Sequence, residues 1–482
     1  MVMTFAPTLE SLATHEVPAW FHDAKFGIFI HWGLYSVPAW APVGADIQEL
    51  IKKGGMEALM RNNPYAEWYM NSMKIPEHPT YKHHRTSYGS KFSYFDFQPI
   101  FEEAAAGMDP AAWADTFSAA GAKYVVMVTK HHDGYTLWPT KKDNPVRENY
   151  FSKRDFVGEL TTEVRKRGLK MGHYYSGVLD WTFNTDPITD FFSFLSNQRQ
   201  SEAYIEYATA HWYEIIERFE TDILWNDIGY PAGCDVNRLF ADYYNTVEDG
   251  VINDRWTQTK IPGNPLGRLL MKAAVARMTR KMKKEGLELE PKCHYDFRTP
   301  EYKTYPDVRP EKWETCRGIG NSFGYNQLEG KDRMMTGAEI IVSLVDTVSK
   351  NGNLLLNVGP TADGTIPEMQ KKPLMELGAW LKKNGEAIYG TRPWTRPDAR
   401  TLEGNDIRFT RTERAVYATV IDPAPRSTIS IPDFPFAAGD SVELLGEPGT
   451  AAAEPIDRGV RVTLKTDVSK TVAPVLRFTR AS

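Results

Sequence analysis

The sequence predicts an irregular (β/α)8-like barrel of the TIM type followed by a C-terminal antiparallel β-sandwich. Two observations predict the barrel. Strand-like apolar runs alternate with helical stretches from residue 26 to residue 360, and no glycine-rich phosphate loop follows the first strand, as it would in a dinucleotide-binding sheet. The sandwich is predicted by short alternating runs that begin near residue 400.

The barrel strands are expected where apolar runs are short and continuous, since strands covered on both faces are apolar throughout. These runs are FGIFIHWG (26–33), KYVVMVTKHHD (123–133), LKMGHYYSG (169–177), TDILWND (221–227), GVINDRW (250–256) and GNLLLNVGP (352–360).

Helices are expected between the strands. Asp109 and Pro110 supply an N-cap followed by proline at the first helical position. Residues 44–98 form a polar, aromatic excursion that makes the barrel irregular. Further helices are expected over 155–168, 198–219, 237–247, 336–350 and 367–388.

The stretch GTRPWTRPD (390–398) is interpreted as a linker because it holds two prolines and a glycine. The runs DIRFT, AVYATVID, STISIP, SVELL, GVRVTLK and VLRFTR follow, separated by Gly, Pro and Asp turns. We therefore predict a barrel domain over residues 1–391 and a sandwich domain over residues 392–482.

Composition and charge narrow the class of partner. The 57 Lys and Arg against 62 Asp and Glu give a net charge of −5, which offers no electrostatic case for nucleic acid or an anionic membrane. Three cysteines without close spacing argue against a disulfide framework or a zinc knuckle. Without a signal-peptide pattern or a long apolar segment, a cytoplasmic protein is expected, and it could be a homo-oligomer.

Every expected barrel strand up to residue 256 ends in polar or aromatic residues. Because the carboxyl ends of barrel strands meet at one face, these residues are expected to share a pocket. A lone strand-end Asp227 would more often be a turn former or a helix cap, but several polar strand ends together favour a site. The ends are His31-Trp32, His131-His132-Asp133, Tyr174-Tyr175, Trp225-Asn226-Asp227 and Asn253-Asp254-Arg255.

No metal or other cofactor is expected in this pocket. Adjacent residues on a strand point to opposite faces, and no HxH pair or His/Cys cluster completes a ligand set around His131 and His132. Hydrogen bonding by these histidines is favoured instead. Arg255 could form a core salt bridge or orient a ligand, and Glu67 and Trp68 could equally lie on a surface helix.

A rigid carboxylate among histidines, Trp and Tyr suits glycoside hydrolysis, and the 13 tryptophans suit sugar stacking. That reaction needs a second carboxyl group. Spacing alone leaves the choice open among Glu67, Asp133, Asp254, Glu301 and Glu314.

Motifs in order along residues 17–395 resemble the α-L-fucosidases of glycoside hydrolase family 29. They are FGIFIHWGLYSVPAW, AEWYMNSM, TKHHDGYTLW, YYSGVLDW, ILWNDIGYP, INDRW, TPEY, RGIGNSFGYNQLEG and GNLLLNVGPTADGTIP. The resemblance implies a retaining exo-glycosidase with a barrel and a sandwich, acting on a fucosylated glycan or a small fucoside.

The resemblance also implies roles for residues. Asp227 matches the nucleophile and Glu301 the acid/base, with Glu314 and Glu67 as the alternatives for Glu301. The residues that match fucose-binding positions are His31, Glu67, Trp68, His131, His132, Tyr174, Trp225, Arg255 and Phe323.

A segment over 261–291 separates Arg255 from Glu301, whereas the bacterial relatives join these two elements by a short connection. Residues 268–284 are strongly basic, and Leu270, Ala274, Met278 and Met282 recur every fourth position, so an amphipathic helix is expected. It could wall the pocket entrance, lie on the surface or contact another subunit.

Three alternatives to the α-L-fucosidase interpretation stay open. One is an α-L-galactosidase acting at the same site. Another is a catalytically inactive fucose-binding lectin, although the presence of both Asp227 and Glu301 argues against it. A metal-dependent amidohydrolase is the third.

Overall fold

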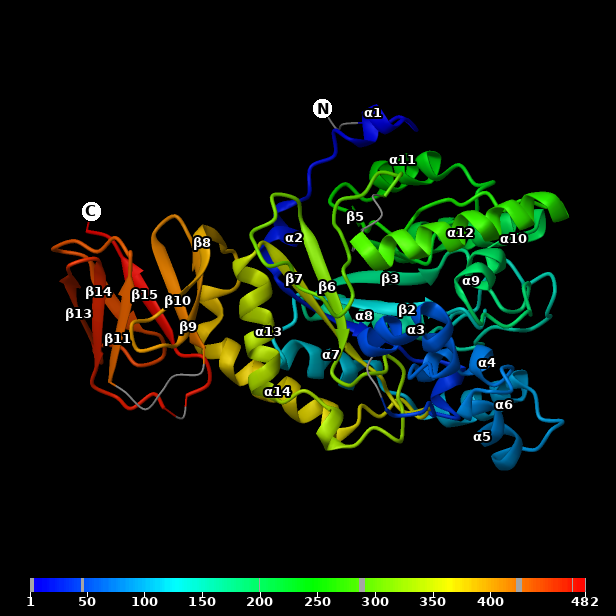
Figure 1. Ribbon diagram of the computed structural model, residues 1–482, viewed down its shortest axis with the longest axis horizontal. Coiled ribbons are helices and arrows are strands. Elements are labelled where there is room, and N and C mark those ends of the chain that lie inside the picture. The colour runs from blue at the N-terminus through cyan, green and yellow to red at the C-terminus, as the bar shows by residue number, and fades with distance from the viewer. Residues whose placement is uncertain are drawn as a thin grey trace.

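The computed structural model describes residues 4–44, 47–198, 200–285, 291–421, 427–469 and 471–481. A barrel surrounded by helices occupies most of the chain, and a smaller body of antiparallel strands packs beside helices α13 (Gly337–Ser349) and α14 (Glu368–Asn384) (Figure 1).

Parallel strands form the barrel sheet, in the order β5-β4-β3-β2-β1-β7-β6. Phe297 bridges Asn253 on the β5 side and Arg298 bridges Trp313 of β6, both in parallel. A two-residue segment therefore stands in the place of an eighth strand, which confirms the irregular (β/α)8-like barrel. The strands are β1 (Phe26–Ile30), β2 (Tyr124–Lys130), β3 (Lys170–Ser176), β4 (Ile223–Asp227), β5 (Val251–Ile252), β6 (Trp313–Gly318) and β7 (Gly352–Val358).

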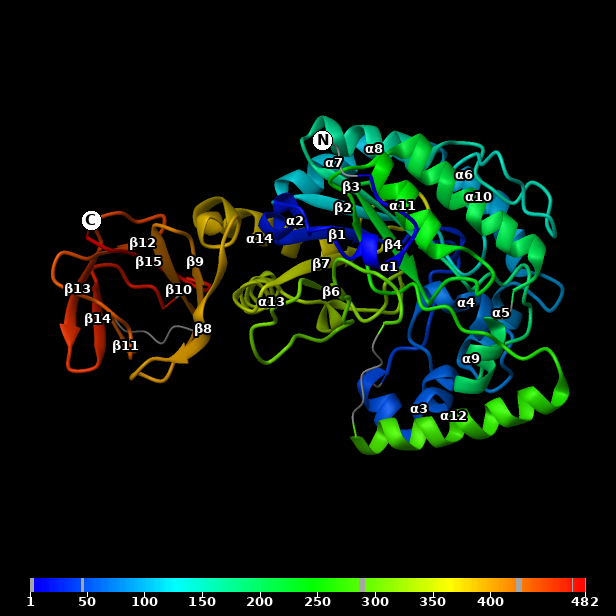
Figure 2. The same cartoon turned by 90° about the horizontal axis from the view of Figure 1, so that it is seen from above.

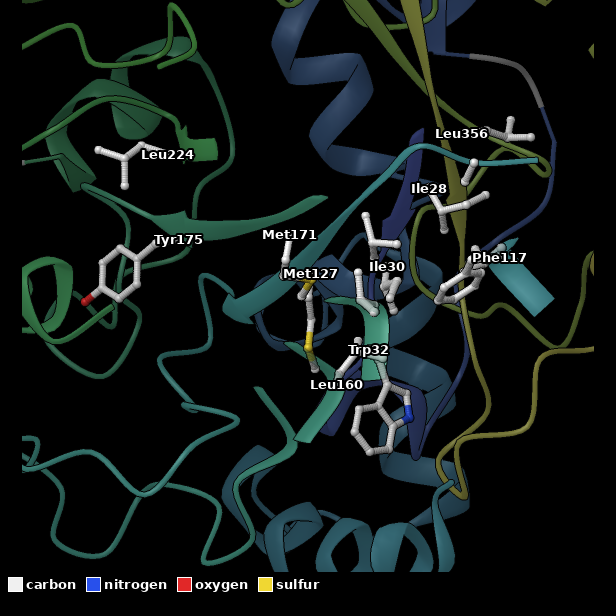
Figure 3. Close-up of a cluster of buried hydrophobic side chains, with 14 of the residues drawn as sticks. Ile28, Ile30, Trp32, Phe117, Met127, Leu160, Met171, Tyr175, Leu224 and Leu356 are labelled. Atoms are coloured by element: carbon white, nitrogen blue, oxygen red, sulfur yellow. The ribbon is translucent and has the colours of Figure 1, made fainter. Parts of the chain in front are cut away.

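In strands β1 to β5 and β7, alternate residues enter two different cores. Ile28 and Ile30 lie in the layer between the sheet and the helices, with Leu160 of helix α8 (Phe156–Lys166) (Figure 3). Phe29 and Trp225 belong to a second cluster inside the barrel. Because side chains two residues apart share a face, Asp227 projects to the same side as Trp225.

The expected helices are present. Asp109 caps one of them by accepting hydrogen bonds from the backbone of Ala111 and Ala112. Residues 44–98, expected only as an excursion, contain three complete α-helices and the start of a fourth in the described part. Besides α13 and α14, the helices are α1 (Leu9–Leu12), α2 (Ala19–Ala24), α3 (Ile47–Arg61), α4 (Tyr69–Ser72), α5 (Pro79–Ser87), α6 (Phe97–Ala104), α7 (Pro110–Ala119), α8 (Phe156–Lys166), α9 (Phe191–Asn197), α10 (Glu202–Phe219), α11 (Val236–Thr246) and α12 (Pro265–Glu285).

The C-terminal strands form two antiparallel sheets around a core that includes Phe409, Phe434 and Phe478, which confirms the sandwich. The expected linker is wrong: residues 392–400 form strand β8 at the edge of its sheet, where proline costs no ladder hydrogen bond. We propose that the boundary between the barrel domain and the sandwich domain lies between residues 391 and 392. The strands are β8 (Arg392–Arg400), β9 (Asp406–Arg411), β10 (Ala415–Ile421), β11 (Thr428–Pro432), β12 (Ser441–Leu444), β13 (Ala451–Ile456), β14 (Gly459–Leu464) and β15 (Val475–Thr479).

Helix α12 forms as expected but buries a different face. Leu270 is 63% exposed, whereas Val275 is 8% exposed. The ammonium of Lys272 lies 5.7 Å from the ring centroid of Phe192 on α9, and Figure 2 shows α12 alongside α9. The predicted face was therefore wrong, although the side chains of Met278 and Met282 lie outside the described residues.

Within the described ranges, none of the helices has the length and apolar character needed to cross a membrane.

Candidate active site

A cavity of about 200 Å³ opens at the carboxyl ends of the barrel strands. The structure brings every predicted site residue to its wall: His31, Glu67, Trp68, His131, His132, Tyr174, Trp225, Asp227, Arg255, Glu301 and Phe323. The other lining residues are Phe29, Met56, Leu59, Met60, Asn63, Tyr65, Phe194, Ile228 and Cys316.

Asp227 lies in the wall of this cavity, held by two donors. Arg255 Nη1 donates to one carboxylate oxygen at 2.8 Å, and Tyr174 Oη donates to the other at 2.8 Å. Burial by itself would raise the pKa of Asp227, but the charge of Arg255 and these hydrogen bonds outweigh it and hold the pKa below 3.8. Asp227 is therefore an anion at neutral pH.

Glu301 is tied to the same arginine. Arg255 Nη2 donates to Glu301 Oε2 at 3.3 Å, and Tyr65 Oη donates to Oε1 at 2.8 Å. Its side chain is 35% exposed, against 11% for Asp227. One guanidinium thus spans two carboxyl groups, one enclosed and one open to solvent.

Arg255 is itself fixed by two further contacts. Its Nε donates to Thr299 Oγ1 at 2.9 Å, and its guanidinium carbon lies 4.8 Å from the ring centroid of Trp225. Such a held fork is preorganised, since little side-chain entropy remains to be lost when a ligand binds.

Aromatic rings inside the barrel form an apolar side of the cavity. Phe29 lies 4.9 Å from Trp225 between ring centroids, and Phe323 lies 6.3 Å from Phe29. Trp225 Nε1 donates to the buried Glu314 at 3.0 Å, which fixes the indole plane. This side can bind a methyl group but offers few hydrogen bonds.

The three histidines of the cavity are neutral. Burial lowers the pKa of His31 to about 3 and that of His132 to about 4, and it lowers the pKa of His131 as well. His31 Nδ1 pairs with Asn357 Oδ1 at 2.7 Å, and His132 Nδ1 pairs with Ser176 Oγ at 2.7 Å. Their rings are suited to hydrogen bonding with hydroxyl groups.

The expectation that His131 and His132 face opposite ways is wrong. Both line the cavity, with ring centroids 4.0 Å apart. The reason is that β2 ends at Lys130, after a register shift between Val128 and Lys130, so the two histidines lie beyond the strand.

Glu67 is the second enclosed carboxyl group of the cavity. Its Oε2 accepts hydrogen bonds from Gly324 N at 2.8 Å and Ser322 Oγ at 3.1 Å. No cation binds it within the described chain, and burial raises its pKa to about 8. Glu67 is therefore protonated at neutral pH and can donate a hydrogen bond.

The other carboxyl candidates lie away from the cavity. Asp133 accepts from Tyr94 Oη at 2.7 Å, and Asp254 accepts from Thr299 Oγ1 at 2.6 Å. Glu314 is fully buried between Tyr124 and Trp225, and burial raises its pKa to about 7. Glu314 therefore does not line the cavity, whereas Glu301 and Glu67 do.

Three residues of the types that bind metal ions lie close together outside the cavity. Nitrogen and oxygen atoms of His15, His294 and Asp296 lie within 4.8 Å of one another. These atoms already form hydrogen bonds. His15 Nδ1 lies 2.8 Å from Asp296 Oδ1, and Tyr244 Oη lies 2.7 Å from His294 Nε2. None of these residues lines the cavity.

Sequence reasoning missed Tyr65, which binds Glu301, and Asn357, which orients His31. Tyr65 stands two positions before Glu67 in NPYAEW, and Asn357 lies near the carboxyl end of β7. Their nearness to recognised motifs was a usable signal.

An enclosed anionic carboxylate, a solvent-facing carboxyl group and neutral hydroxyl-binding residues define a glycosidase-type site. The family model for α-L-fucosidase matches residues 2–386. The chain therefore belongs to the α-L-fucosidase family.

Individual relatives agree. Human tissue α-L-fucosidase is 31% identical over 95% of this chain and 88% of its own. A crystal structure of the Thermotoga maritima α-fucosidase with a mechanism-based inhibitor is 40% identical, covers 99% of this chain and 100% of its own, and superposes with a TM-score of 0.82. Another structure of that enzyme, in complex with fucose, is equally similar, with 40% identity and a TM-score of 0.82 over 98% of this chain and 100% of its own.

Proposed function

We propose that this protein is a retaining exo-α-L-fucosidase in which Asp227 is the nucleophile and Glu301 the acid/base. The observation that supports these roles is the position of Arg255, which donates to both carboxyl groups from one guanidinium. Retaining glycosidases need two carboxyl groups close enough for direct attack on the sugar, about 5 Å apart.

The proposed reaction has two steps. Asp227 attacks the anomeric carbon of an α-L-fucoside while Glu301 gives a proton to the departing oxygen. The resulting β-fucosyl ester is then hydrolysed by a water molecule that Glu301 deprotonates. The exposed position of Glu301 suits both proton transfers, because the leaving group departs toward the solvent and the water molecule enters from it.

The wall of the cavity suits a single fucose. Neutral His31, His131 and His132, with protonated Glu67, would bind the ring hydroxyls. The aromatic side formed by Phe29, Trp225 and Phe323 would bury the C6 methyl group. Trp68 and Tyr174 complete the proposed sugar contacts, and Arg255 holds both carboxyl groups. A cavity of about 200 Å³ supports removal of one terminal residue. The substrate would be a fucosylated glycan or a small fucoside.

The same aromatic side argues against an α-L-galactoside. That sugar carries a hydroxyl at C6, which would be buried without a partner at a cost of about 1 to 3 kcal/mol. The lectin alternative is disfavoured because the chain belongs to the α-L-fucosidase family, and sugar binding alone does not require a pair of carboxyl groups held by one arginine. The cytoplasmic compartment and a homo-oligomeric state stay predictions.

Release of 4-nitrophenol from its α-L-fucoside and α-L-galactoside tests the proposal. We expect the fucoside to be hydrolysed with a kcat/KM at least about 10-fold higher than the galactoside. Equal rates would favour the galactosidase alternative. Binding of L-fucose without turnover of either substrate would favour the lectin.

A further inference from the structure

Several apolar side chains that line the cavity have no role in the proposed binding of fucose. Met56, Leu59 and Met60 come from α3, Phe194 comes from α9, and Ile228 follows Asp227. These five residues are called the leaving-group wall. Leu59 and Met60 are buried, while the other three are half-buried.

The leaving-group wall is connected to the proposed acid/base. Helix α3 ends at Arg61, and Asn63 Oδ1 then accepts from the backbone N–H of Tyr65 at 2.9 Å. Tyr65 in turn donates to Glu301 at 2.8 Å. Since Glu301 must protonate the glycosidic oxygen, the group attached to that oxygen departs on the side where α3 ends.

The backbone presents this part of α3 separately from the rest of the helix. Gly55 has φ +69° and ψ −154°, which breaks the helix immediately before Met56. A residue with a side chain rarely adopts this conformation. The turn of helix that carries Met56, Leu59 and Met60 therefore has an orientation of its own.

Helix α9 is held at its N-terminus and by a contact with α12. Asp190 and Ser193 form a capping box at its N-terminus, where Ser193 N donates to Asp190 at 2.6 Å. On its other side, Phe192 faces Lys272 of α12. No described side chain of α12 lines the cavity, so α12 supports the wall from behind rather than forming it.

The leaving-group wall contains no charged or hydroxyl group. Its polar neighbour is the amide of Asn63, which is 1% exposed and whose Nδ2 has no hydrogen-bond partner among the described residues. Because this Nδ2 atom is itself buried, a leaving group rich in hydroxyls would lose hydrogen bonds to water here without replacement.

We propose that the leaving-group wall is a subsite for an alkyl or aryl aglycone, so that this enzyme prefers fucosides whose leaving group is apolar next to the glycosidic oxygen. The proposal rests on the proposed function, because it assumes that Glu301 protonates the leaving oxygen. It names the substrate class that the fucose-binding residues leave open.

The test compares heptyl and 2-(2-methoxyethoxy)ethyl α-L-fucosides, whose chains are equally long but differ in polarity. We expect the wild-type enzyme to hydrolyse the heptyl compound with a kcat/KM about 10-fold higher. In the Met56→Ser/Phe194→Ser variant the ratio should fall to about 2-fold. Ile51→Ser is the matched control, because Ile51 lies on α3, is 38% exposed and does not line the cavity.

α-L-Fucosyl fluoride separates failure of this inference from failure of the proposed function, since a fluoride ion is too small to reach the wall. The inference is overturned if the wild-type enzyme hydrolyses the fluoride but hydrolyses the heptyl compound no faster than the ether. It is also overturned if the double variant keeps the full preference. If the fluoride is not hydrolysed, the proposed function itself fails. Should the double variant not fold, Met56→Gln, which nearly preserves volume, must still lower the ratio.

Discussion

The Asp227 side of the cavity and the Glu67 side bury carboxyl groups to a similar depth with opposite results. Counted over the whole residue, Asp227 is 8% exposed and Glu67 is 2% exposed. Arg255 binds Asp227 and lowers its pKa below 3.8, whereas Glu67 receives only neutral donors and its pKa rises to about 8. One guanidinium therefore decides which buried carboxyl group can attack and which can only hydrogen-bond.

The largest expected effect is at the anionic side. Asp227→Ala should lower kcat on all fucosides by a factor on the order of 10⁴, because no other group can form the ester. Azide should partly restore turnover by occupying the vacated space, and the product should be β-fucosyl azide. An α-configured azide, identified by NMR, would place the nucleophile elsewhere.

Glu301→Ala should reduce kcat/KM by a factor on the order of 10² to 10³ for alkyl fucosides, which need protonation. The loss for 4-nitrophenyl α-L-fucoside, whose leaving group is stable as an anion, should be about 10-fold or less. Azide should here yield α-fucosyl azide, which makes this variant the matched control for Asp227→Ala. Equal losses on both substrates would remove Glu301 from the acid role.

Arg255→Met would remove the difference between the two buried carboxyl groups, Asp227 and Glu67. Without the guanidinium, burial dominates and the pKa of Asp227 should rise, so the acidic limb of the kcat/KM profile moves to higher pH. We expect a loss on the order of 100-fold at about pH 5 that shrinks as pH increases. Arg255→Lys, which keeps a charge, should shift the limb less. An unchanged limb would show that Arg255 does not keep Asp227 ionised.

The last effect concerns the neutral side and is on stability, not on turnover. Glu67 keeps its proton in the folded protein up to about pH 8 but loses it near pH 4.5 when unfolded, so it makes folding less favourable as pH rises between these values. The slope is up to about 1.4 kcal/mol per pH unit. In Glu67→Gln this slope should vanish, so the variant gains Tm relative to wild type from about pH 5 to about pH 8.

Glu57→Gln is the control for this measurement, because Glu57 lies on α3 with a side chain that is 60% exposed. Parallel Tm curves for wild type and Glu67→Gln would mean that Glu67 is ionised in the folded protein.

The sequence predicted the strands that are apolar throughout, because burial on both faces leaves a simple pattern. Strand β6 was not predicted, because polar and apolar residues are mixed in WETCRG. Its Glu314 points into the barrel, where it binds Tyr124 and Trp225. Strand β8 escaped because its prolines are tolerated only at a sheet edge, which depends on tertiary structure.

The members of the site were predictable from strand ends and family motifs, but their protonation was not. Whether Asp227 or Glu67 is charged depends on which side chain lies within hydrogen-bonding distance in space. Arg255 reaches Asp227 from the next strand end, while Ser322 and Gly324 reach Glu67 from a distant loop.

The role of Asp227 is tested most directly by trapping the intermediate. The enzyme would be incubated with 2-deoxy-2-fluoro-α-L-fucosyl fluoride, which forms the ester faster than it is hydrolysed, and its proteolytic peptides mapped by mass spectrometry. The proposed mechanism predicts one label per chain, on the peptide that contains Asp227, and protection by L-fucose. A label on Glu301 or Glu67, or turnover with no covalent adduct, would contradict it.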